Sequence, residues 1–128
     1  AMNTGHEGSM TTVHANTPRD SIGRLVNMAG LTTANFSERF MLQTVARALN
    51  LVIQLTRFPD GTRKVVNISE ITGMEGDVIT LQDVFEFRQK GVDANGKVLG
   101  EFRATGVRPR CLERIARAGA SVGIGYGT

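Results

Sequence analysis

The hydrophobic pattern of this chain changes period near residue 50, and that change limits the folds open to it. Before residue 50, apolar residues recur every three or four positions over 18–30 and 34–49, which predicts two helices. After residue 50, apolar and polar residues alternate as in a half-buried strand, and turn residues follow at 58–62 and 93–96. We therefore expect a hairpin of 51–57 with 63–72, then a strand over 79–88 that pairs with 97–105.

The two ends of the chain complete the predicted element order. Residues 9–15 contain strand formers and predict a short strand, and Pro109 is placed to open a last helix that stops at Gly119. Residues 120–128 hold three glycines and are expected to form a flexible tail. The fold class is α/β: a strand, two helices, an antiparallel strand meander and a final helix. Such a meander is more typical of a sheet extension than of a doubly wound core.

Composition narrows the classes of protein. The length of 128 residues fits one domain, and the single cysteine, Cys111, excludes an internal disulfide framework. No apolar run approaches the roughly 20 residues of a transmembrane helix, and no signal peptide is visible. Arginine supplies 12 of the 15 basic residues, but the net charge is only +3 and aromatic residues are 5% of the chain. A nucleic-acid binder is therefore an alternative that the low aromatic content opposes.

Polar residues gather at the start of the chain, where both histidines lie. His6 stands in a loop between Gly5 and Gly8, and His14 lies at the end of the predicted strand. Histidine, threonine and backbone N–H groups suit phosphate oxygens or an attacking water, while the plain structural interpretation is a polar loop with an exposed His6. The spacing of the histidines is not that of a metal site, and we predict none.

A nucleotide triphosphate site of the usual kind is missing from these residues. The chain has no Gly-x4-Gly-Lys-Ser/Thr loop, and its one Gly-Lys pair, at 96–97, falls in a hairpin turn. We therefore expect no ATP hydrolysis and no tight ATP binding by the 128 residues alone.

Three segments resemble the ATPases of type II and type IV secretion. Residues 3–22, NTGHEGSMTTVHANTPRDSI, are similar to the histidine box of that superfamily. Residues 69–86, SEITGMEGDVITLQDVFE, and the FRATGxRP motif at 102–109 resemble the CpaF-type branch, which serves Flp (tight-adherence) pili. The resemblance runs from residue 1 to about 118.

The resemblance implies the C-terminal part of a RecA-like P-loop ATPase domain, over residues 1–119. It implies a hexameric ring in the cytoplasm, peripheral at the bacterial inner membrane, that uses ATP and Mg²⁺ in the parent protein. The implied partners are copies of the chain and inner-membrane platform proteins of the pilus or secretion system, with no nucleic acid.

The same resemblance assigns site residues. His6 and His14 are the histidine-box pair, which lies near the phosphate end of the nucleotide and helps to couple hydrolysis to subunit movement. Gly5 and Gly8 let the backbone pass close by, and the weaker candidates are Thr12 as a polar support and Arg19 as an interface or phosphate contact. The alternative function is a non-enzymatic interaction module of a secretion or pilus system, which the absence of an intact catalytic set favours.

Overall fold

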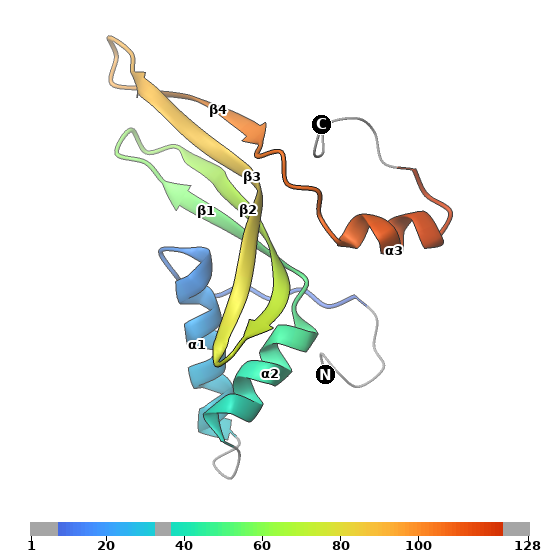
Figure 1. Ribbon diagram of the computed structural model, residues 1–128. Helices are drawn as coiled ribbons and strands as arrows, with labels where there is room; N and C mark the ends of the chain where they lie inside the picture. The colour runs from blue at the N-terminus through green and yellow to red at the C-terminus, as the bar shows by residue number, and fades with distance from the viewer. Residues whose placement is uncertain (1–7, 33–36, 122–128) are drawn as a thin grey trace.

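A computed structural model describes residues 8–32 and 37–121, and over these residues the chain forms three helices and four strands (Figure 1). In chain order the elements are α1 (Pro18–Thr32), α2 (Glu38–Ala48), β1 (Leu51–Arg57), β2 (Arg63–Glu75), β3 (Val78–Val92), β4 (Val98–Ala104) and α3 (Cys111–Arg117). The α/β class and the helix–meander–helix order agree with the sequence prediction.

The four strands form one antiparallel meander in the order β1-β2-β3-β4. Local turn chemistry explains why the predicted hairpins form. In the first turn the Asp60 carboxylate accepts from the backbone N–H of Thr62 at 2.8 Å, and Gly61 adopts a φ of +85°. In the last turn the Asp93 carboxylate accepts from the N–H groups of Asn95 and Lys97. Both turns therefore rest on residues within five positions of each other.

The hydrophobic core lies between α1, α2 and one face of the sheet. Both helices lie near the turn between β2 and β3 (Figure 1). The buried members of the core are Ile22, Val26, Met41, Val45, Ile71 and Ile79. Ile79 is the most enclosed of these, at 2% exposure. The helices thus cover the face of β2 to which Ile71 points.

Helix α3 is held from the sheet by Glu70, the residue before Ile71. Successive side chains of a strand point to opposite faces, so Glu70 points away from the core. Its carboxylate accepts from the backbone N–H groups of Arg110 and Cys111, each at 2.8 Å, and from the Gln82 amide at 2.9 Å. Burial by itself would raise the pKa of Glu70, but these three donors outweigh it and hold the pKa below its usual 4.5. Glu70 is therefore a buried anion that fixes the start of α3.

Several element boundaries differ from the sequence prediction. α2 begins at Glu38, because the Ser37 side chain accepts from the N–H of Phe40 and caps the helix there. α3 begins at Cys111, where Glu70 supplies the acceptor, so Pro109 does not open it. β2 runs to Glu75 and β3 begins at Val78, since Gly76 and Asp77 form the turn between them, and β3 continues to Val92, which pairs with Val98 of β4.

The predicted strand over 9–15 is the clearest error. Residues 8–15 form no regular structure, and no strand of the described chain pairs with them. A strand needs a neighbour for its backbone groups, and strand propensity alone does not supply one. Residues 120–121 form no regular structure, and the rest of the expected tail lies outside the described residues. In the described ranges, no helix is long and apolar enough to cross a membrane.

Candidate functional site

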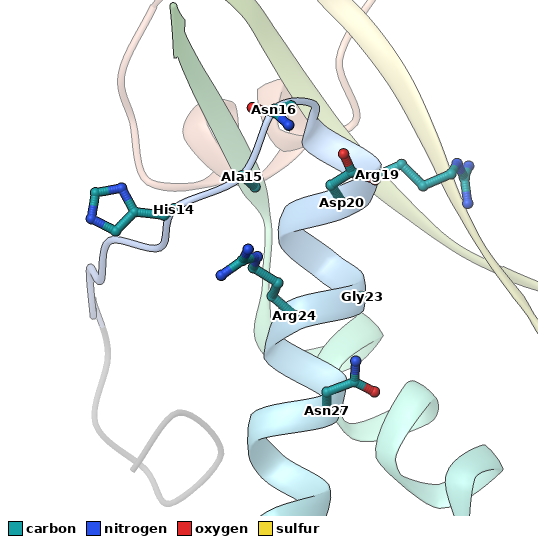
Figure 2. A pocket seen from close by; sticks show the side chains of 8 residues that line it. All are labelled: His14, Ala15, Asn16, Arg19, Asp20, Gly23, Arg24 and Asn27. Carbon is teal, nitrogen blue, oxygen red and sulfur yellow. The ribbon is translucent and has the colours of Figure 1, made fainter.

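A polar groove lies where the segment 8–16 meets α1 (Figure 2). It encloses about 520 Å³ and is lined by His14, Ala15, Asn16, Arg19, Asp20, Gly23, Arg24 and Asn27. The lining side chains are mainly charged groups and amides. Among the histidine-box candidates, the structure therefore brings His14 and Arg19 to one groove.

Two hydrogen bonds fix the chain on the C-terminal side of His14. The carbonyl of Ala15 accepts from the Gln54 amide of β1 at 2.9 Å. The Thr17 hydroxyl then accepts from the N–H of Asp20 at 3.1 Å, which caps α1 as its sequence predicts. The imidazole of His14 itself is exposed and points away from α1 (Figure 2). His14 is thus a free ring on a held backbone.

Arg24 is the cation of the groove, and the sequence analysis missed it. Asp20, Arg24 and Asn27 recur at i, i+4 and i+7, so they share one face of α1. Figure 2 shows the Arg24 side chain extending from α1 toward the side on which His14 lies. It is exposed and has no salt bridge within the part of the chain that the structure describes. The helical spacing of these polar residues was the signal that could have found it.

The guanidinium of Arg19 makes a structural contact with the sheet. Its Nη1 donates to the backbone carbonyl of Ile79 at 3.1 Å. The side chain therefore points away from the groove and toward the sheet (Figure 2). Arg19 contributes its backbone to the groove wall and its side chain to the joint between α1 and β3.

The other candidates lie away from the groove or outside the described residues. Gly8 adopts a φ of +79°, a conformation that favours glycine, but no atom of the described residues lies within 4 Å of the place a Cβ would take. Thr12 is exposed and does not line the groove. His6 and Gly5 lie outside the described residues. The structure thus brings neither Gly8 nor Thr12 to His14.

The donors of the groove suit an anion better than a metal. The Arg24 guanidinium and the amides of Asn16 and Asn27 can donate to phosphate oxygens. Across residues 8–32 and 37–121, no group of three or more His, Cys, Asp or Glu side chains could hold a metal ion. These donors fit contacts to part of a phosphate group and do not form a complete site for Mg²⁺ and ATP.

The sequence that forms these elements matches one family of known proteins. Residues 1–107 match the type II/IV secretion system protein family. The match covers both histidines, the groove and all four strands. The chain belongs to this family.

Two conjugation proteins are similar to this chain. The conjugal transfer protein TrbB of Rhizobium radiobacter is 33% identical over 76 residues, which is 59% of this chain and 21% of that protein. The probable conjugal transfer protein TrbB of Sinorhizobium fredii is 33% identical over 63 residues, or 49% of this chain and 18% of that protein. The chain spans about a fifth of the length of these relatives.

Proposed function

We propose that this chain forms the C-terminal part of a motor domain in a type II/IV secretion system, where His6 and His14 help to couple ATP hydrolysis to movement. The observation that carries the proposal is the family match over residues 1–107, which includes both histidines. The groove supports it, because His14 and Arg24 there share one polar surface.

The proposed role of the groove is to position groups around the phosphate end of a nucleotide. ATP with Mg²⁺ supplies the phosphoryl transfer, and parts of the parent protein beyond these residues hold both. This chain adds the Arg24 cation and the amides of Asn16 and Asn27, which can contact phosphate oxygens. The exposed His14 imidazole is free to accept or donate a proton near the attacking water.

The proposed biological setting is a CpaF-type motor of Flp pili. The segments GMEGDVITLQD and FRATGxRP support this branch through their resemblance. In this setting six copies form a ring on the cytoplasmic side of the inner membrane and contact its platform proteins. A conjugal transfer system is the second candidate, because two relatives at 33% identity are named conjugal transfer proteins.

Histidine substitutions in the full-length protein test the motor function. We expect His14→Ala to lower the rate of ATP hydrolysis by roughly 10- to 1,000-fold while ATP affinity stays within a few-fold. His6→Ala should behave in the same way. Asn95→Ala, in an exposed hairpin turn away from the groove, is the control and should leave both quantities unchanged.

The outcome separates the motor from an interaction module. Unchanged hydrolysis in both histidine variants would remove the histidine-box assignment and favour the non-enzymatic alternative. If hydrolysis does fall, a strain carrying His14→Ala distinguishes the two biological settings. Loss of pilus assembly would indicate a pilus motor, and loss of conjugal transfer would indicate a conjugation motor.

A further inference from the structure

A buried amide on β1 holds the segment that carries His14. Gln54 is only 7% exposed, although it lies on a strand at the edge of the sheet. Its Nε2 donates to the carbonyl of Ala15 at 2.9 Å and to the carbonyl of Leu55 at 3.1 Å. Both protons of the amide are thus used.

The position of Gln54 follows from the alternation of side chains along β1. Gln54 lies on the same face of the strand as Val52 and Thr56, which is the less exposed face. The register of β1 against β2 shifts just after Gln54, and the extra residue, Val66, belongs to β2. From this face the Gln54 amide reaches a residue 39 positions earlier in the chain.

The bond matters because it ties an irregular part of the chain to the sheet. Residues 8–15 form no regular structure, and no described strand pairs with them. Ala15 directly follows His14 and lies beside β1 in Figure 2. The place of the His14 backbone therefore depends on where β1 holds Ala15, together with the short path from Ala15 to the capped start of α1.

We infer that Gln54 is a positioning residue for His14, which links the antiparallel sheet to the histidine groove. A displacement of β1 moves Ala15 through this hydrogen bond, and His14 moves with it relative to Arg24. The inference rests on the proposed function. The Gln54–Ala15 hydrogen bond would connect ATP hydrolysis at the groove to movement of the sheet.

Gln54→Met in the full-length protein tests the link, because methionine keeps the length of the side chain and removes both donors. We expect the rate of hydrolysis to fall by roughly 2- to 100-fold, the range of coupling between contacting groups, at unchanged ATP affinity. Gln89→Met is the matched control, since Gln89 is an exposed amide on β3. It should leave the rate unchanged.

The double variant with His14→Ala separates positioning from a merely structural role. If Gln54 acts through His14, the double variant is no slower than His14→Ala alone. A structural role would instead multiply the two rate losses. In the 128-residue chain, Gln54→Met should shift the NMR signal of the Ala15 carbonyl carbon, which loses its hydrogen-bond donor, without shifting the carbonyl signals of β3 and β4.

Each failure has its own signature. A silent His14→Ala removes the proposed function and the role of Gln54 with it. Two other results overturn the role of Gln54 but leave the proposed function standing. In the first, His14→Ala lowers the rate of hydrolysis and Gln54→Met does not. In the second, the rate losses multiply in the double variant. An unchanged signal of the Ala15 carbonyl carbon in Gln54→Met contradicts the hydrogen-bonded link directly.

Discussion

Two segments flank the sheet, and a buried polar side chain holds each of them by its backbone. The N-terminal segment 8–16 is held by the Gln54 amide, through one carbonyl. The C-terminal segment from 105 to α3 is held by the Glu70 carboxylate, through two N–H groups. Each bond joins residues about 40 positions apart. Yet the first segment stays irregular and the second forms a helix.

The difference shows what charge and the number of bonds achieve. Glu70 is ionised, so its hydrogen bonds are stronger than those of a neutral amide. It also satisfies N–H groups at a helix start, which have no partner inside the helix. Gln54 binds a single carbonyl of the N-terminal segment, and no described strand forms a ladder with the backbone of residues 8–15. A helix thus forms in the segment whose first backbone N–H groups receive hydrogen-bond acceptors from the sheet.

Removal of the Glu70 charge should produce the largest effect. Glu70→Gln keeps the shape but offers one acceptor, so one of the two buried N–H groups at Arg110 and Cys111 loses its partner. We expect the free energy of unfolding to fall by about 1–3 kcal/mol, measured by urea denaturation. Glu101→Gln on β4 is the control, since that exposed carboxylate forms a solvent-exposed ion pair with Lys90, and it should change little. Equal effects of the two variants would contradict the proposed strength of the α3 attachment.

Acid should release α3 before it affects the Gln54 contact. The pKa of Glu70 is below its usual 4.5, so its stabilisation is complete above about pH 4.5 and is lost as the pH falls through the lowered value. The amide signals of Arg110 and Cys111 should therefore titrate in this range by NMR, with a midpoint below 4.5. The amide of Gln54 does not ionise, so signals around Ala15 should not follow this titration. A midpoint above 4.5 would show that burial outweighs the three donors.

Asp60 supplies an internal reference in the same titration. Hydrogen bonds from the Thr62 hydroxyl, the Val98 N–H and the Thr62 N–H lower its pKa from 3.8 to about 2. The turn between β1 and β2 should therefore keep its stabilisation until the pH falls toward 2. Its Thr62 amide signal reports this second step separately.

Removal of the Gln54 amide should have the smallest effect on stability. Gln54→Met costs the Ala15 carbonyl its described partner, and we expect the free energy of unfolding to fall by about 1 kcal/mol or less. Within the error of urea denaturation, this loss should be the same at every pH between about 3 and 7. The loss caused by Glu70→Gln should instead depend on the pH. A loss as large as that of Glu70→Gln would end the contrast between the two attachments.

The sequence prediction was accurate for elements that are stabilised by residues close in the chain, and it failed where an element needs a distant partner. The β1 bounds and the turn at 58–62 were predicted correctly, because Asp60, Gly61 and Thr62 stabilise that turn within three residues. The start of α1 was predicted from Thr17 and Pro18 for the same reason. The strand at 9–15 was wrong, because strand-forming residues without a neighbour form no ladder.

The candidate site was predicted only in part. His14 was identified and lies in the groove, whereas Arg24 was missed although it stands four residues after Asp20 on the same helix face. The guanidinium of Arg19 was expected near phosphate or an interface, but the structure bonds it to Ile79, 60 residues later. Such a partner has no local signal in the sequence.

The sequence by itself determined the α/β class, the antiparallel meander and the start of α1, since periodicity and caps act over a few residues. The tertiary structure decided which backbone groups Gln54 and Glu70 bind. These contacts in turn decided how the N-terminal segment and the segment leading to α3 are attached to the sheet. The physical reason is that a buried polar group must find a partner wherever the fold brings one. That partner is set by the packing of the sheet, 39 to 41 residues away along the chain.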